Sequence, residues 1–283
     1  MDTDNRGGGF LNLMEWPVRR YPYRGRAQFV KSWEEEVSRQ RDVAAKECFS
    51  DLSEWMLFTG VDQQTFTQDF LDPATPWTNI SWCSFDKVNS LLLVRMPKSR
   101  QHESAARQFS KIFDKAVEPT GLESALRDLG SATQDGPSGK KEPDCSWLPI
   151  RLPRGRSDHW PSVVVEVSFS ETSSKLMSDV RYWLGDSQGD VELVITIKIN
   201  RKKPEFEIVT WEYDAAAALR RRRVQVVFIS KTDNNISING SPMIIGFDKL
   251  FLRQPSNNRE RDLTLDAAKL EQFASRVWRE QHL

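Results

Sequence analysis

The chain has 283 residues, of which 39% are hydrophobic and 28% are charged, and its 40 basic and 40 acidic side chains give a formal net charge of zero. This length and composition fit one large or two small folded domains and exclude a disordered chain. The charge balance excludes a protein whose whole surface is basic. Local basic patches stay compatible with it, because the sum does not show where the charges lie.

No segment has the roughly 20 consecutive apolar residues that cross a bilayer, so we expect no membrane span. Of the first six residues, all but Met1 are polar, whereas a secretory signal has an apolar core. The three cysteines, Cys48, Cys83 and Cys145, are too few and too far apart for a disulfide framework or a zinc cluster. We therefore expect a reducing intracellular location, in the cytoplasm or the nucleus.

The N-terminal third is predicted to be helical after a flexible start. Residues 1–27 contain three consecutive glycines and several arginines, which predicts a flexible or extended arm. Apolar residues recur at helical spacing from Phe29 to Phe58, which predicts one or two helices that end near Gly60. We assign residues 28–84 to a helical N-terminal segment, whose helices offer a face for a homodimer or for a protein partner.

From residue 85 to residue 283, the sequence predicts a mixed α/β core with a mixed central sheet flanked by helices. Short strands are expected at 82–85 and 91–96, a helix at 102–117, and a loop at 131–141. The later pattern is mostly β, with strands expected at 144–150, 162–169, 191–200, 206–213 and 224–230. A helix is expected at 173–184, and a hairpin followed by a helix over 263–281 closes the chain.

Two acidic residues stand in the strand region in a pattern that suggests chemistry. Glu166 lies within a run of valines, where a carboxylate is costly to bury unless it is paired or binds a cation. Asp144 begins the preceding predicted strand, so strand pairing brings the two carboxylates together. Carboxylate oxygens are the ligands that Mg²⁺ and Mn²⁺ prefer. The alternative is that Glu166 faces solvent on a one-sided sheet or pairs with an arginine.

This arrangement resembles the PD-(D/E)XK nuclease-like superfamily, and within it the Uma-type bacterial proteins and their fungal relatives. The residues that carry the resemblance are His102-Glu103, Pro143-Asp144 and Glu166-Val167-Ser168. The resemblance covers about residues 90–215 and implies a restriction-endonuclease-like core of order αβββαβ. It also implies Mg²⁺-dependent cleavage of nucleic-acid phosphodiesters, with Asp144 and Glu166 at the metal-ligand positions.

The third position of the motif departs from the family. A lysine normally stands two residues after the glutamate and helps to orient and deprotonate the attacking water, but here the residue is Ser168, which supplies no positive charge. Lys175 on the next predicted helix and Lys198 in the next strand are candidates for a displaced catalytic lysine. Each is otherwise an ordinary surface lysine. Glu103 is a candidate for a further metal ligand from the helix.

Three clusters of basic residues suit contacts with phosphate groups, which give affinity without sequence readout. The two that we assign to nucleic-acid binding contain Arg151, Arg154 and Arg156 in a loop, and Arg220, Arg221, Arg222 and Arg223 before a strand. The third cluster occupies the turn at residues 201–203. The alternatives are solvated turns or, for the four consecutive arginines, a nuclear-import signal.

Two functions are consistent with these patterns. The first is a metal-dependent nuclease that uses Mg²⁺ or Mn²⁺ and a displaced lysine. The second is a catalytically inactive nuclease-like fold that acts as a nucleic-acid- or protein-binding module, which the serine at position 168 favours. The sequence contains no phosphate-binding loop, dinucleotide-binding motif or nucleophile elbow that would indicate another chemistry.

Overall fold

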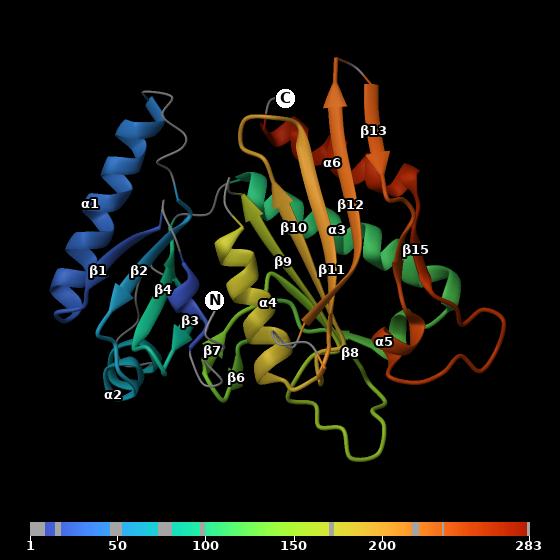
Figure 1. Ribbon diagram of the computed structural model, residues 1–283, viewed down its shortest axis with the longest axis horizontal. Coiled ribbons are helices and arrows are strands. Elements are labelled where there is room, and N and C mark those ends of the chain that lie inside the picture. Colours follow the sequence, from blue (N-terminus) through green and yellow to red (C-terminus); the bar gives the residue numbers. More distant parts are fainter. Residues whose placement is uncertain are drawn as a thin grey trace.

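The computed structural model of the protein describes residues 9–14, 18–45, 53–72, 81–96, 100–169, 173–216, 221–233 and 235–281. Within these ranges, two large β-sheets and the helices around them lie in successive layers, and a two-stranded sheet adds to them (Figure 1). The architecture is therefore mixed α/β with mixed sheets flanked by helices, as the sequence predicts. None of the described helices is long and apolar enough to cross a membrane.

The larger sheet has seven strands in the spatial order β13-β12-β11-β10-β9-β8-β5. Their bounds are Leu126–Asp128 (β5), Cys145–Pro149 (β8), Val163–Phe169 (β9), Leu193–Ile199 (β10), Glu205–Tyr213 (β11), Arg221–Thr232 (β12) and Asn235–Asn239 (β13). Strands β9 and β10 are parallel, and all other neighbours are antiparallel. Helix α3 (Arg100–Val117) precedes these strands, and helix α4 (Ser174–Asp186) connects β9 to β10. The elements α3, β5, β8, β9, α4 and β10 thus follow the αβββαβ order that the resemblance implies.

The smaller sheet has six strands in the order β1-β2-β4-β3-β7-β6. Their bounds are Arg19–Pro22 (β1), Trp55–Thr59 (β2), Ser81–Asp86 (β3), Leu91–Arg95 (β4), Gln134–Gly136 (β6) and Gly139–Lys141 (β7). Helix α1 (Arg26–Ala45) and the short helix α2 (Gln63–Phe66) accompany this sheet. The C-terminal elements are β14 (Met243–Ile245), α5 (Phe247–Phe251), β15 (Leu263–Leu265) and α6 (Ala267–Gln281), and β14 pairs with β15.

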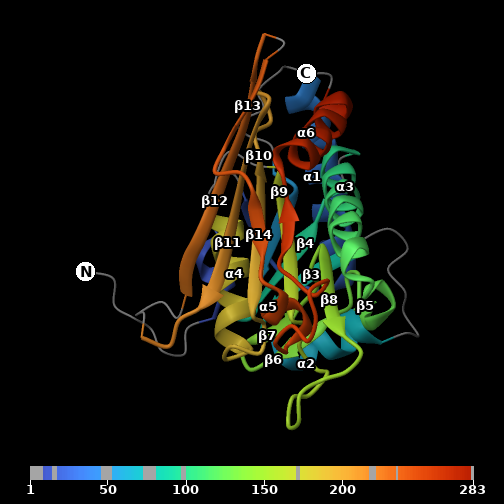
Figure 2. The same cartoon turned by 90° about the vertical axis from the view of Figure 1, so that its right-hand side faces the viewer.

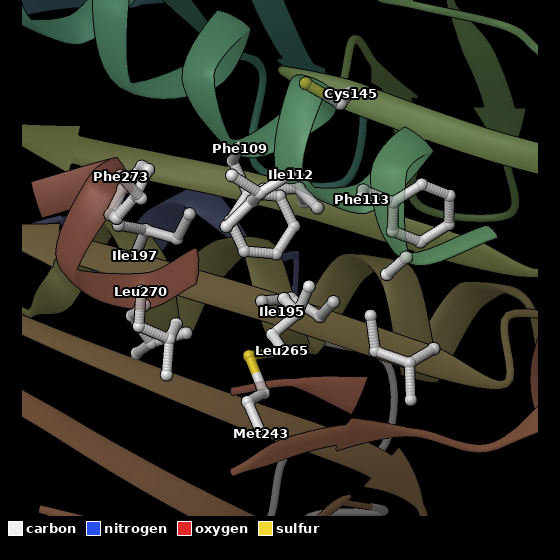
Figure 3. Packing of buried hydrophobic residues seen from close by; sticks show 14 of the residues in the cluster. Phe109, Ile112, Phe113, Cys145, Ile195, Ile197, Met243, Leu265, Leu270 and Phe273 are labelled. Atoms are coloured by element: carbon white, nitrogen blue, oxygen red, sulfur yellow. The ribbon is translucent and has the colours of Figure 1, made fainter. Parts of the chain in front are cut away.

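Helices α3 and α6 cover one face of the larger sheet (Figure 2). Figure 3 shows the core between them, in which Phe109 of α3 and Phe273 of α6 face Ile195 and Ile197 of β10. The odd-numbered valines of β9 join the same core because successive side chains of a strand point to opposite faces. Glu166 and Ser168 therefore point to the opposite face of the sheet, toward α4.

Helix α4 lies between the two sheets. One buried cluster contains Trp183 of α4, Val164 of β9 in the larger sheet, and Leu93 of β4 in the smaller sheet. The outer face of the smaller sheet is covered by α1 and α2, where Phe29 and Phe66 are fully buried. Because α4 contacts sheets on two sides, polar residues along it become buried wherever the second sheet covers them.

The N-terminal segment differs from the prediction. Residues 55–59, predicted as the end of a helix, form strand β2, whose first four residues are all buried. A strand covered on both faces gives a continuous apolar run, which periodicity cannot distinguish from a buried helix. In the predicted arm, Phe10, Leu11 and Met14 are buried beside α4, and β1 pairs with β2. Residues 1–8 and 15–17 of that arm lie outside the described residues, and the predicted boundary at 84/85 falls inside β3.

The loop predicted at residues 131–141 contains a hairpin of two three-residue strands, β6 and β7, that extends the smaller sheet. The turn-rich composition that predicts a loop is also that of a tight hairpin. Gly139 allows the close approach of β7 to β3, because a Cβ at this position would collide with the carbonyl oxygen of Phe85. This hairpin places Lys141 at the inner side of the smaller sheet.

Candidate functional site

Glu166 is enclosed by positively charged and hydrogen-bonding groups. Its side chain is only 1% exposed. Its Oε1 accepts a hydrogen bond from the indole N–H of Trp183 at 2.6 Å and lies 3.1 Å from the Nζ of Lys141. Its Oε2 accepts a hydrogen bond from the Nζ of Lys175 at 3.0 Å. Both carboxylate oxygens are therefore engaged.

Asp179 completes a buried group of four charges, which we call the ion-pair tetrad (Lys141, Glu166, Lys175 and Asp179). The Nζ of Lys141 lies 2.7 Å from Oδ1 of Asp179, and the Nζ of Lys175 lies 2.6 Å from Oδ2. These contacts do not have the angles of good hydrogen bonds, so we treat them as close ion pairs. Two carboxylates and two ammonium groups cancel, as burial requires.

The tetrad connects the two sheets through α4. Lys141 comes from β7 of the smaller sheet, Glu166 from β9 of the larger sheet, and Lys175 and Asp179 from α4, at a helical spacing of four residues. Burial lowers the pKa values of both lysines, but the charges of Asp179 and Glu166 outweigh it, so both pKa values lie above their usual range. Both lysines are consequently charged at neutral pH.

Asp144 belongs to a second, adjacent group of ion pairs. Its Oδ1 accepts a hydrogen bond from Arg95 at 2.9 Å, and its Oδ2 accepts the backbone N–H of Val167 at 2.8 Å. The Nε2 of His102 lies 3.4 Å from Oδ2. Burial raises the pKa of Asp144, yet the neighbouring His102 and Arg95 hold it well below its usual range. Asp144 is therefore held as a carboxylate by its own cations.

The pairing of β8 with β9 brings Asp144 and Glu166 to the same region, as the sequence predicts, but different cations hold them. Cys145 pairs with Val165 in the antiparallel β8–β9 ladder, so the next position along the ladder brings Asp144 beside Glu166. The ring of Trp55 lies beneath both sets of cations, because its centroid is 4.8 Å from the guanidinium of Arg95 and 4.5 Å from the Nζ of Lys175. A cation of each carboxylate therefore contacts the same indole ring.

A cavity of about 400 Å³ opens at Asp144, and its lining includes Arg95, Glu103 and Glu142. Glu166 does not line it. Glu103 lies in the first turn of α3, with one carboxylate oxygen 3.8 Å from a guanidinium nitrogen of Arg107. The cavity therefore reaches one predicted metal ligand pair, Asp144 and Glu103, and is separated from the other predicted ligand.

The predicted metal ligands do not fit a divalent ion in this arrangement. In the ranges that the structure describes, no group of three or more His, Cys, Asp or Glu side chains is placed to hold a metal ion. Mg²⁺ requires oxygen ligands at about 2.1 Å and keeps several waters. An ion at Glu166 would have to displace an ammonium group from a carboxylate that has no exposure to water. Binding of Mg²⁺ or Mn²⁺ by Asp144, Glu166 and Glu103 stays a prediction that the side-chain contacts do not favour.

Of the two predicted lysines, the structure brings Lys175 to Glu166 and does not bring Lys198 there. Lys198 pairs with Ser168 in the β9–β10 register and shares the α4 face, but its Nζ donates to the Oγ of Ser173 at 3.1 Å. Ser168 itself is fully buried, and its hydroxyl has no hydrogen-bond partner among the described residues. The position that normally carries the lysine is thus neither charged nor open to solvent.

Comparisons with known proteins do not assign a function to this chain. No known family model matches the sequence, and no curated protein is significantly similar. A solved structure of a nuclease candidate of the DUF820 family from Anabaena variabilis matches 74% of this chain and 97% of its own, with 12% identity and a TM-score of 0.39. A likeness at this level carries no argument about function. The αβββαβ core stands on the strand order described above.

The loop arginines have different roles. Arg156 is structural, because its guanidinium donates to the carbonyl oxygens of Trp160 and Asp190, each at 2.8 Å, and also pairs with the Asp190 carboxylate. Arg151 and Arg154 are exposed. This loop follows β8 and precedes β9, so it lies at the end of the larger sheet where β9 begins, whereas Glu166 lies at the middle of that strand.

Three of the four consecutive arginines, Arg221, Arg222 and Arg223, lie in β12 and are divided between its two faces. Arg220 lies outside the described residues. Arg222 pairs with Glu212 across the β11–β12 ladder, with a nitrogen-to-oxygen distance of 2.8 Å. Arg221 and Arg223 alternate with it and point to the opposite face. The ladder places Arg221, Arg222 and Arg223 at the same end of the sheet as the loop that contains Arg151 and Arg154. This follows because the end of β11 lies beside the start of β10.

Sequence reasoning missed Lys141, Asp179, Arg95 and Trp183 as partners of the predicted carboxylates. Asp179 had a signal, since it follows Lys175 by four residues on a predicted helix, a spacing that favours ion pairs. Lys141 and Arg95 had none, because each comes from the smaller sheet and reaches its partner only through tertiary packing.

Proposed function

We propose that this chain is a nuclease-like fold that binds nucleic acid without cleaving it. The observation that supports this best is the engagement of both Glu166 oxygens by Lys141, Lys175 and Trp183 inside the protein. Metal-dependent hydrolysis needs carboxylates that share an ion with open positions for water and phosphate. Here two fixed ammonium groups supply the positive charge, and they leave no position for a reacting water.

The proposed binding role rests on the basic residues at the end of the larger sheet where β9 begins. Arg151 and Arg154 are exposed there, and Arg221 and Arg223 lie at the same end. Arginine side chains bind phosphate groups bidentately and without reading base sequence. Because this end is separate from the ion-pair tetrad, binding at it does not require the carboxylates.

A metal-dependent nuclease is the second candidate, and one observation favours it. Lys175 lies 3.0 Å from Glu166, as a displaced catalytic lysine would, and Asp144 lines a cavity that substrate atoms can enter. Activity would require the ammonium of Lys175 to move from between the carboxylates when a metal ion enters. This candidate therefore predicts measurable metal binding to the wild-type protein.

One experiment separates the two candidates. Single-stranded and double-stranded DNA and RNA are incubated with the protein in Mg²⁺ or Mn²⁺, and binding of the same substrates is followed by fluorescence anisotropy at several salt concentrations. We expect binding that weakens as salt rises, because counterions are released from the phosphates, and no cleavage. Cleavage that EDTA abolishes and that a folded Asp144→Asn variant lacks would establish the nuclease instead. Absence of any binding at low salt would refute the proposed binding role.

A further inference from the structure

Three exposed apolar side chains lie together on β12. Val224, Val226 and Phe228 are 50%, 36% and 39% exposed. Val226 and Phe228 alternate with Val227 and Ile229, which are buried in the core that α3 and α6 cover. The two exposed side chains therefore point to the other face of the larger sheet, which α4 covers only in part. Exposed apolar residues are ordinary when they are scattered singly, whereas a contiguous set indicates an interaction surface.

The sheet around these side chains is open and uncharged. In Figure 1, α3 and α6 pass behind β12 and β13, whereas α4 lies to their left. On β13, Asn239 lies opposite Phe228 and Ser237 lies opposite Ser230, and both β13 residues are exposed. Strand β13 is the last of the sheet and carries no charged residue or proline, although such residues commonly prevent edge strands from associating. The centre of this face therefore offers apolar and uncharged polar groups to a partner.

Opposite charges stand at equal distances on either side of this centre. Val226 pairs with Val209 in the β11–β12 ladder. Two positions along β11 from Val209 in one direction, the ladder reaches Arg223, and two positions in the other direction it reaches Glu207. The following positions on this face carry the same opposite charges, in Arg221 and Glu205. The face is therefore positive at one end and negative at the other, with Val226 midway.

The two inner charges are not neutralised by each other or by their neighbours. In the described part of the chain, neither Arg223 nor Glu207 forms an ion pair, and the guanidinium of Arg223 lies over the indole of Trp211, 5.9 Å from its centroid. Lys198 lies opposite Glu207 in the β10–β11 ladder, but its ammonium donates to the Ser173 hydroxyl at 3.1 Å. Both charges therefore suit a partner that presents the opposite charges at the same spacing.

We infer that a second copy of this chain packs on this face. A two-fold axis that runs across the strands at Val226 sets the strands of the two copies antiparallel, with Val226 of one copy against Val226 of the other. The same rotation places Arg223 of each copy across from Glu207 and Phe228 of the other copy. A two-fold interface must be self-complementary in this way, because one patch serves both copies. Packed sheets lie about 10 Å apart, a gap that an arginine and a glutamate side chain can span together.

This interface goes beyond the proposed function, and it is a different surface from the N-terminal helices that the sequence suggests for a dimer. In the dimer, Arg221 and Arg223 face carboxylates of the second copy, and the exposed Arg151 and Arg154 remain for phosphate groups. Association is therefore measured without nucleic acid, so that its failure is distinct from a failure of nucleic-acid binding.

The test measures the mass of the full chain by sedimentation velocity at increasing protein concentration. We expect the wild type to reach twice the mass of one chain. Val226→Asp places two carboxylates against each other at the axis, and it should raise the dimer dissociation constant about tenfold or more, because like charges that meet in an interface oppose association. Val88→Asp is the matched control, since Val88 is 47% exposed in the turn between β3 and β4 of the smaller sheet. It should change the constant less than about twofold.

A charge exchange tests the register of the two copies. Arg223→Glu alone and Glu207→Arg alone each place like charges across the axis, so each should weaken the dimer about tenfold. The double variant restores opposite charges and should return the dissociation constant to within about threefold of the wild-type value. Circular dichroism checks that each variant is folded, and the charge exchange alone decides if Val226→Asp is not.

A wild type that stays monomeric at every concentration would overturn the inference. Equal dimerisation of wild type and folded Val226→Asp would assign association to another surface and would also overturn it, as would equal weakening by Val226→Asp and Val88→Asp. Absence of rescue in the charge-exchange double variant would overturn the two-fold register. None of these outcomes changes the anisotropy experiment on nucleic acid, which tests the proposed function separately.

Discussion

Removing one ammonium group from the ion-pair tetrad should destabilise the fold strongly. In Lys175→Met, the side-chain volume is nearly kept, but Glu166 and Asp179 are left facing Lys141 alone, so the tetrad acquires a net negative charge inside the protein. Lys175 is buried with a side chain only 4% exposed, so water cannot replace the lost charge. Breaking a buried ion pair by removing one partner costs about 3–5 kcal/mol. Lys175 closes two such contacts, so we expect the upper part of that range.

This loss is large relative to the stability of a folded protein, which is typically about 5–15 kcal/mol. At about 2–4 °C per kcal/mol for a chain of this size class, a loss of about 4–5 kcal/mol should lower the melting temperature by roughly 8–20 °C. Urea denaturation followed by circular dichroism measures the free energy directly. Lys198→Met is the matched control, because the Lys198 ammonium contacts the Ser173 hydroxyl at an exposed position, and we expect a change within about 0.5 kcal/mol.

A double variant tests whether charge imbalance is the cause. Lys175→Met combined with Glu166→Gln restores one carboxylate to one ammonium, Asp179 with Lys141, at 2.7 Å. The double variant should therefore be more stable than the sum of the single losses predicts, with a coupling of about 1–3 kcal/mol. The reasoning is refuted if the free energy of unfolding of Lys175→Met lies within about 1 kcal/mol of the wild-type value. It is also refuted if the double variant loses the sum of the two single-variant losses.

Three further predictions concern acid stability and two glycines. The pKa of Asp144 is well below its usual range, so its contribution to stability is present above the unfolded-state value of about 3.9 and is lost as the pH falls through the folded-state value. The melting temperature of Asp144→Asn should therefore change less between neutral and acid pH than that of wild type, and an identical acid profile would contradict this. Gly139→Ala should cost about 1–3 kcal/mol in urea denaturation, because its Cβ would collide with the Phe85 carbonyl oxygen. Gly185→Ala, in α4 with open space around the added Cβ, should instead stabilise by about 0.5 kcal/mol, and a destabilisation would show that the helix end needs glycine.

Most of the larger sheet was predictable from local pattern, although its short edge strand β5 was not expected. Of the smaller sheet, only β3 and β4 were expected, at residues 82–85 and 91–96. In β9 a run of valines is followed by Glu166, Val167 and Ser168 in alternation, and α3 presents its apolar residues on one face, so these elements follow from their residue patterns. Strand β2 is apolar on both faces because α1 and α4 cover it from opposite sides, and no window of sequence shows that second cover. The hairpin of β6 and β7 is too short for its alternation to be distinct from a loop.

The candidate site was predictable where it depends on strand order, and not where it depends on the contact between sheets. The neighbouring positions of Asp144 and Glu166 follow from adjacent strands, and Lys175 follows from a helix that begins just after β9. Lys141 and Arg95 reach the carboxylates from a different sheet. When Lys141 and Arg95 are not considered, the sequence predicts two buried carboxylates that need a cation, and a metal ion is the simplest candidate. The structure supplies the cations from within the chain.

The position of α4 between the two sheets has a consequence for how the molecule comes apart. Helix α4 belongs to neither sheet alone, because its residues pack on Val164 of the larger sheet and on Leu93 of the smaller sheet within one cluster. Separating the sheets would expose apolar surface on both and would break the tetrad at the same moment. Cleaving the chain between the first strands and the rest would therefore not yield two parts that fold independently. Heating should produce one calorimetric transition in which both sheets unfold together.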